Sequence, residues 1–189
     1  MIKSLLSRSL LPAALGLLLI NQASAQLLKT GPSVFNYNFG DLAYVDDDIA
    51  DGFGLRFSAD IRENYALQVA YRRLSAGSLD VDAITGSVAY HIESSRFRGK
   101  ADWVFDVGID IIDAESIDET GLNAGAGIRY AITDALEGNA AVNLTTAFDT
   151  DLSLELRGLY EVTTGFSAFL GIEIGDGSVF ELGARYYWR

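Results

Sequence analysis

The feature that most constrains the fold of this chain is an alternation of apolar residues with polar or small ones, which recurs along the sequence after residue 25. In the stretch "GFGLRFSADI", the apolar positions are Phe53, Leu55, Phe57, Ala59 and Ile61. Successive side chains of a β-strand point to opposite faces, so this period predicts strands with one apolar face. No segment after residue 25 has a sustained helical period. The sequence therefore predicts an all-β fold.

The alternation divides into ten segments, each about the nine to eleven residues that a tilted strand needs to cross a membrane. The connections between segments are of two kinds. One set is acidic and contains no base, with "DDDIAD", "SLDVD", "DAESIDE", "DTD" and "GDG", and the other set reads "RENY", "ESSRFRGK", "TDALEG" and "TTGF". The two sets indicate the two ends of one closed sheet. We predict a closed antiparallel up-and-down barrel over residues 33–189, with ten strands and with eight as the alternative.

The first predicted strand, residues 33–45, is less regular than the others. Phe35, Tyr37 and Phe39 share one phase of the alternation, whereas Leu42 and Tyr44 fall on the opposite phase. A β-bulge adds one residue and reverses the phase. The sequence therefore predicts a bulge near Gly40.

The position of the apolar face distinguishes a soluble barrel, apolar within, from a membrane barrel, apolar outside. A barrel of this size has room inside only for tightly packed side chains or a small ligand, too little for this many large residues. Aromatic residues of the apolar face also gather near the strand ends, as in the girdles of membrane barrels. One predicted girdle holds Phe35, Tyr37, Tyr65, Tyr90, Trp103, Tyr130, Tyr160, Phe166, Tyr186 and Trp188, and the other holds Tyr44, Phe53, Tyr71 and Phe180. These features predict a transmembrane barrel with an apolar exterior.

Three acidic residues, Asp41, Asp80 and Asp82, fall on the apolar phase. A charge facing lipid at mid-depth costs about 2 to 4 kcal/mol. Each of the three lies near an acidic connection or the predicted bulge, so we expect them to lie beyond the hydrocarbon layer.

The opposite face combines small residues with charges of both signs. We expect its charged side chains to form ion-pair networks across a narrow lumen. The predicted lumen charges are Arg56, Asp60, Arg72, Asp102, Asp106, Arg129, Glu137, Glu155, Arg157, Glu161, Glu173, Glu181 and Arg185.

The beginning of the chain has the three-part pattern of a secretory signal peptide. Lys3 and Arg8 precede an apolar run from Leu10 to Ile20, and small residues follow at 23–25. The run is too short for a membrane-spanning helix, which needs roughly 20 residues. We predict cleavage after Ala25 and a short periplasmic segment over residues 26–32.

The final stretch, "ELGARYYWR", combines a polar residue, a glycine and two aromatics at Glu181, Gly183, Tyr186 and Trp188. With the signal peptide and the alternating strands, it resembles the small outer-membrane β-barrels of Gram-negative bacteria, of OmpA- and OmpX-like architecture. The resemblance implies that these four residues act as an assembly signal for the barrel-assembly machinery. It also implies transit with periplasmic chaperones, a location in the outer membrane among lipid and lipopolysaccharide, and a monomeric barrel.

Composition and motifs bear on the chemistry. The net charge of −12 argues against a nucleic-acid partner, and the chain has no cysteine to ligate a metal. His91 is the only histidine and stands near Ser94, the kind of pair that an outer-membrane enzyme uses. Asp46, Asp48 and Asp51 offer oxygen ligands to divalent cations but lack the spacing of a known calcium loop. We expect no cofactor and no dedicated metal or catalytic site.

Three functional hypotheses follow. The first is a non-enzymatic outer-membrane barrel with an envelope-structural or surface-interaction role and a lumen filled by charged networks. The second is a narrow, cation-preferring pore for small solutes, whose selectivity the lumen charges set. The third is a lipid A-modifying or other membrane enzyme.

Overall fold

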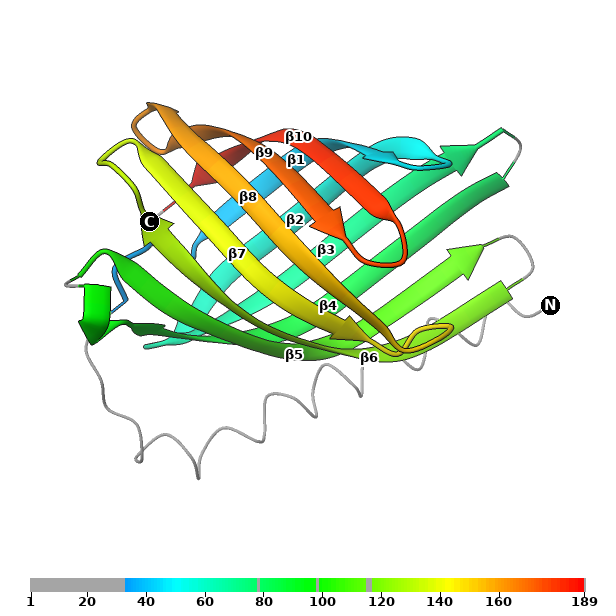
Figure 1. The fold of residues 1–189 in the computed structure, drawn as a ribbon, viewed down its shortest axis with the longest axis horizontal. Coiled ribbons are helices and arrows are strands. Elements are labelled where there is room, and N and C mark those ends of the chain that lie inside the picture. The colour runs from blue at the N-terminus through cyan, green and yellow to red at the C-terminus, as the bar shows by residue number, and fades with distance from the viewer. Residues whose placement is uncertain (1–32, 78, 98, 115–116, 189) are drawn as a thin grey trace. The chain divides into compact units, whose positions relative to one another are not determined.

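A computed structural model of the chain describes residues 33–77, 79–97, 99–114 and 117–188, which form a closed barrel of antiparallel strands (Figure 1). Each strand pairs with its neighbours in sequence, and β1 pairs with β10 to close the ring. The strands are β1 (Phe39–Asp47), β2 (Asp51–Arg62), β3 (Tyr65–Ala76), β4 (Leu79–Glu93), β5 (Ala101–Ala114), β6 (Ile117–Ala131), β7 (Leu136–Thr145), β8 (Asp151–Thr163), β9 (Phe166–Ile174) and β10 (Ser178–Tyr187). The prediction of an all-β, ten-stranded, up-and-down barrel is confirmed.

One short 3-10 helix, η2 (Ser95–Phe97), lies between β4 and β5. In the part of the chain that the structure describes, no helix is long and apolar enough to cross a membrane. The predicted signal peptide, residues 1–25, and the segment 26–32 lie outside the described residues.

The barrel has two ends of different character. At the terminal end, β1 begins beside the end of β10, where Phe39 pairs with Tyr187. The turns after β2, β4, β6 and β8 lie at this end, and the acidic connections after the odd-numbered strands lie at the other, which we call the acidic end.

The exterior of the barrel is apolar. Leu42 is 59% exposed, Leu122 is 64% exposed and Leu182 is 62% exposed. Predicted girdle residues are exposed with them, namely Tyr44, Phe53, Trp103, Tyr160, Phe166, Phe180 and Tyr186. Soluble monomers rarely leave so continuous an apolar surface in water. The distribution is that of a barrel whose wall faces lipid, where closure leaves no strand edge with unpaired backbone groups.

The start of β1 differs from the prediction. The pairing of β1 with β10 runs without interruption from Phe39 to Asp47, so there is no bulge near Gly40. Phe39 and Ala43 are buried, while Leu42 and Tyr44 face outward. The alternation of β1 needs no bulge to reverse it, because Phe39 points into the lumen. The strand also starts at Phe39 and not at residue 33.

Two residues of the predicted exterior girdle therefore belong elsewhere. Tyr37 is 1% exposed, and the rings of both Phe35 and Tyr37 lie against the guanidinium of Arg129, a lumen residue. The prediction that Phe35 and Tyr37 face lipid is wrong, because the chain before Phe39 turns into the barrel, where side-chain partners hold it.

The three acidic residues on the apolar phase separate into two cases. Asp41 is buried in the lumen, where it pairs with Arg185 and Arg157, so its predicted place beyond the hydrocarbon layer is wrong. Asp80 and Asp82 lie in the first residues of β4, at the acidic end. Their carboxylates accept hydrogen bonds from Arg73 at 2.7 Å and from the Tyr71 hydroxyl at 2.5 Å, respectively.

The seam between β1 and β10 leaves no room for a side chain at Gly183. A Cβ placed there would lie 2.4 Å from the carbonyl oxygen of Leu42 and 2.6 Å from the Phe169 ring. We expect Gly183→Ala to destabilise the barrel by about 1 to 3 kcal/mol through overpacking. Refolding into detergent, followed by urea titration and heat-modifiable gel migration, measures this loss without the assembly machinery.

Gly158→Ala provides the matched control, because a Cβ at Gly158 in β8 meets nothing within 4 Å. An equal loss of stability in both variants would show that the close contact at the seam is not the cause.

Candidate functional site in the barrel lumen

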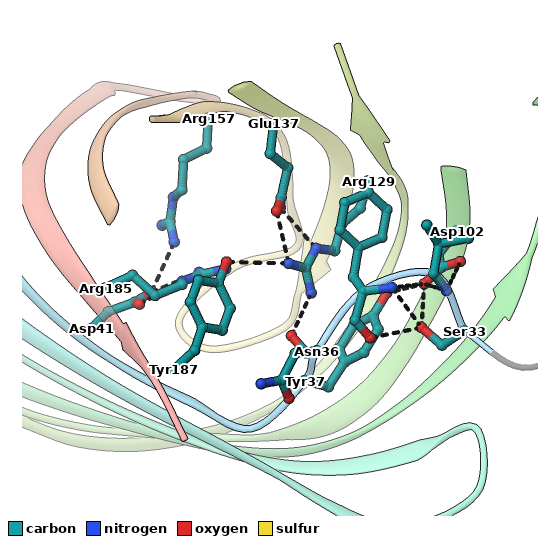
Figure 2. A network of polar contacts seen from close by, with 12 residues as sticks. Ser33, Asn36, Tyr37, Asp41, Asp102, Arg129, Glu137, Arg157, Arg185 and Tyr187 are labelled. Carbon is teal, nitrogen blue, oxygen red and sulfur yellow. Dashed lines mark hydrogen bonds and ion pairs between the residues drawn. The ribbon is translucent and has the colours of Figure 1, made fainter. Parts of the chain in front are cut away.

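A network of arginines and carboxylates fills one side of the lumen. Asp41 of β1 lies at its centre and accepts two hydrogen bonds from Arg185, from Nε at 2.7 Å and from Nη2 at 2.8 Å. Arg157 of β8 adds a third at 3.3 Å. All three side chains are almost completely buried. Buried charges are tolerated only when paired and hydrogen-bonded, and this carboxylate is paired twice (Figure 2).

Arg157 extends the network across the lumen. It pairs with Glu155 at 3.2 Å and donates to the Glu181 carboxylate, while its guanidinium lies 4.8 Å from the centre of the Phe169 ring. Glu181 also pairs with Arg72 at 3.1 Å. Weaker pairs join Arg72 to Glu173 at 3.7 Å and Arg56 to Glu155 at 3.8 Å. The connected charges link β1, β2, β3, β8, β9 and β10.

A second cluster lies at the terminal end, around residues 33–38, which we call the inner segment. Asp102 of β5 is fully buried. Its carboxylate accepts hydrogen bonds from the backbone of the inner segment, from Val34 N–H at 3.0 Å and from Phe35 N–H at 3.4 Å. The same carboxylate accepts from the Ser33 hydroxyl and from the Tyr37 hydroxyl at 3.2 Å. One carboxylate thus binds four donors of the inner segment.

Arg129 of β6 holds the inner segment from another strand. Its guanidinium lies 4.5 Å from the centre of the Phe35 ring and 4.6 Å from that of Tyr37. It donates to the carbonyl of Asn36 at 3.3 Å, and its charge is met by Glu137 of β7 through bonds of 2.8 and 3.0 Å. Figure 2 shows Arg129 between Glu137 and the inner segment.

The structure brings most of the predicted lumen charges together. The first network contains Arg56, Arg72, Glu155, Arg157, Glu173, Glu181 and Arg185, and the terminal cluster contains Asp102, Arg129 and Glu137. Asp60 joins the terminal cluster through Asn38 and His91. Asp106 lines the cavity described below. Glu161 is exposed at the end of β8 and forms no ion pair with another described residue.

Sequence reasoning missed several lumen residues. The alternation predicts Asp41 beyond the hydrocarbon layer and Tyr37 and Phe39 on the apolar face, whereas all three are buried on the lumen side. Asp110 was not singled out, although it accepts hydrogen bonds from Thr85, Asn123 and Thr145 at 2.7 to 2.8 Å. Asp110 has the same strand phase as Asp102 and Asp106, and that signal was sufficient to find it.

Beside the networks the lumen holds a cavity of about 400 Å³. Tyr37, Phe39 and Arg129 line it toward the terminal end, and Thr145 and Asp151 line it toward the acidic end. Between them the wall presents the amides and hydroxyls of Gln68, Thr85, Ser87, Asn123, Asn139, Asn143 and Ser153, interspersed with alanines and a few larger apolar residues. The cavity therefore runs along the barrel between its two ends.

The charges that face this cavity differ in their pairing. Each arginine that lines it has a carboxylate partner, and these arginines are Arg56, Arg72, Arg129, Arg157 and Arg185. By contrast, Asp106, Asp110 and Asp151 line the cavity without an ion pair to any described residue. The arginines of the cavity wall are thus paired with carboxylates, whereas three of its aspartates have no paired base in the described part of the chain.

His91 lies in the terminal cluster. Its ring stacks on Tyr37 with centres 3.7 Å apart, and its Nε2 lies 3.3 Å from Asp60 Oδ1. Within the described ranges, no hydrogen bond joins His91 to Ser94, the partner considered from the sequence. Also within these ranges, no three His, Asp or Glu side chains are grouped to hold a metal ion.

Comparison with known proteins identifies the fold. No protein-family model matches the sequence, and no curated protein matches it. Among solved structures, the chain is similar to the KdgM porin, with a TM-score of 0.54 and 8% identity over 80% of this chain and 99% of that one. The NanC porin gives a TM-score of 0.56 and 7% identity, over 79% and 99%. At this identity the likeness concerns the fold alone, which is that of a small outer-membrane β-barrel.

The pairing of Asp41 leads to a stability prediction. Asp41→Asn removes the charge that two buried arginines share, and breaking a buried pair costs about 3 to 5 kcal/mol. We expect a clear fall in the free energy of unfolding, measured by urea titration of the refolded barrel.

The exposed pair of Asp80 with Arg73 offers the control. Asp80→Asn removes the same charge where solvent screens it, so its effect on stability is expected to be much smaller. Equal effects of the two substitutions would contradict the assigned role of the Asp41 network.

Proposed function

We propose that this protein is a non-enzymatic outer-membrane barrel that forms a narrow, cation-preferring pore for small solutes. The observation that carries the proposal is the cavity beside the ion-pair networks, in which every arginine is paired while Asp106, Asp110 and Asp151 are not. Rings and rows of unpaired carboxylates favour cations in channels.

The apolar exterior and the fold support the location. A wall with so much exposed apolar surface is suited to lipid, and the solved structures similar to this chain include two porins. The residues Glu181, Gly183, Tyr186 and Trp188 fit the assembly signal that the resemblance implies. Contact with lipopolysaccharide, passage through the assembly machinery and a monomeric state are part of the same proposal.

The pairing of the arginines argues for cations over anions. One structure of the KdgM porin is described as a complex with disordered oligogalacturonate, an acidic saccharide. An acidic solute in the present lumen would have to compete with Glu155, Glu181 and Asp41 for their arginines. A cation meets unpaired carboxylates without breaking any of these pairs.

A closed barrel with a structural role is the second candidate. The observation that favours it is the inner segment, which lies across the terminal end of the lumen and is held there by Asp102 and Arg129. In this case the networks and the inner segment together stabilise the barrel and no solute crosses.

Planar-bilayer recording of the purified barrel decides between these candidates. We expect openings whose reversal potential in a KCl gradient has the sign of potassium selectivity. Asp106→Asn combined with Asp110→Asn should shift that potential toward zero, because it removes two of the unpaired charges.

A second double variant, Glu63→Gln with Asp134→Asn, removes two exposed charges at the terminal end and should leave the potential nearly unchanged. Anion preference would overturn the proposal. Silence of both the parent and a variant lacking residues 26–37 would leave the closed structural barrel as the function.

A further inference from the structure

The inner segment crosses the lumen from one side of the barrel to the other. Residues 33–35 are bound to Asp102 of β5, and the chain enters β1 at Phe39. In the closed ring, β5 and β6 lie across from β1, with three or more strands between on either path. Six extended residues reach about 20 Å. The inner segment therefore bridges the terminal mouth.

Its partners lie on several strands and beyond the end of β10. The side-chain amide of Asn38 forms two hydrogen bonds with Asp60 of β2. It donates to the Asp60 carboxylate at 3.2 Å and accepts from the Asp60 N–H at 2.9 Å. Tyr37 stacks on His91 of β4. Asn36 accepts from Arg129 of β6 and donates to the carbonyl of Trp188, beyond β10, at 3.0 Å. The Tyr37 ring lies among His91 of β4, Asp102 of β5 and Arg129 of β6, the Phe35 ring lies against Arg129, and Tyr37 lines the cavity.

The inner segment is held mainly by side chains, not by sheet pairing. The strand ladder of β1 begins only at Phe39. Before it, the Asp102 carboxylate takes the backbone N–H groups of Val34 and Phe35, which a neighbouring strand would otherwise take. Releasing residues 33–37 therefore breaks the Asp102 cluster, the Arg129 contacts, the Tyr37–His91 stack and the bond from Asn36 to Trp188, none of which belongs to the strand ladder of the wall.

We propose that residues 33–38 are a gate for the terminal mouth, closed by Asp102 and by the stacking of Phe35 and Tyr37 with Arg129. This inference rests on the proposed pore function and specifies how its current is controlled. With the gate seated, aromatic side chains block the path between the cavity and the terminal end. With the gate released, the cavity is continuous with that end.

Two variants are expected to release the gate, one by a change in the inner segment and one by a change in the barrel wall. Tyr37→Ala lies in the inner segment itself, outside every strand, and removes the stack on His91, the contact with Arg129 and the bond to Asp102. Asp102→Ala removes the carboxylate from the wall. We expect both to raise the mean single-channel conductance, or the fraction of time the channel is open, several-fold over the parent.

Each variant has a matched control. Tyr160→Ala deletes the same side chain on the exterior, where Tyr160 is 58% exposed. Asp113→Ala deletes the same charge on the same strand as Asp102, near the acidic end. Neither control should change the current, and heat-modifiable migration shows that each variant is folded.

A second measurement follows the inner segment directly. The chain has no cysteine, so Val34→Cys gives a single site for a spin label on an exposed position of the inner segment. The label should be immobilised in the parent background and become mobile when Tyr37→Ala or Asp102→Ala is added, with no change from the two controls.

Increased label mobility together with increased current supports the gate. Unchanged mobility shows that Asp102 and Tyr37 do not hold the inner segment and overturns the proposal. Increased mobility with an unaltered current in a conducting parent overturns the gate alone and leaves the pore. Increased mobility with silence in the parent and in both variants overturns the pore and the gate with it.

Discussion

The constraint on which the rest of this structure depends is that a wall facing lipid can carry charge only on its inner side. Alternating side chains then force half of every strand to point into a narrow space, and the charges of ten strands meet there. An isolated charge in such a space would cost several kcal/mol, so most of the lumen charges are paired, and Asp110, which has no ion pair to a described residue, accepts three hydrogen bonds instead. The connected pairs of Asp41, Arg157, Glu181 and Arg72 are the result.

The small residues of the inner face are part of the same arrangement. Arg157 passes close to Gly171, and the Glu181 side chain lies beside the same glycine. Glycine there gives the long arginine side chains the space to extend across the lumen and reach carboxylates on other strands. The remaining cavity lies along β3 to β8, where short amides, hydroxyls and alanines stand between the charged side chains of the inner face. Side-chain size on each strand therefore decides which side of the lumen is filled and which is open.

The sequence was sufficient for the wall because the alternation of each strand is local. Phe53, Leu55 and Phe57 show their common face without reference to any other strand, and ten such segments define the barrel. The same rule placed Arg157 and Glu181 in the lumen, although it could not say which charges pair. It failed at Phe35 and Tyr37, because period-two spacing was read as a strand in a stretch that pairs with no strand.

The reason for that failure lies in long-range contacts. Tyr37 and Asn36 are held by Asp102 and Arg129, which are 65 and 93 residues away in the sequence. Nothing near residues 33–38 indicates those partners, and Asp41 falls on the apolar phase, and so is predicted beyond the hydrocarbon layer, only when its phase is counted from Phe35 and Tyr37. Once Phe39 is placed inside, Asp41 follows to the same face, and its pairs with Arg157 and Arg185 explain why a charge is tolerated there.

The path of the inner segment also bears on the order in which contacts form during folding. Residues 33–38 precede all ten strands in the chain, yet their binding groups exist only after β5 and β6 have been placed in the sheet. Contacts over such sequence separation form late, because closing a long loop costs entropy before the contact repays it. The first described stretch of the chain is thus among the last to reach its native position, inside a cylinder that the later strands must already have outlined.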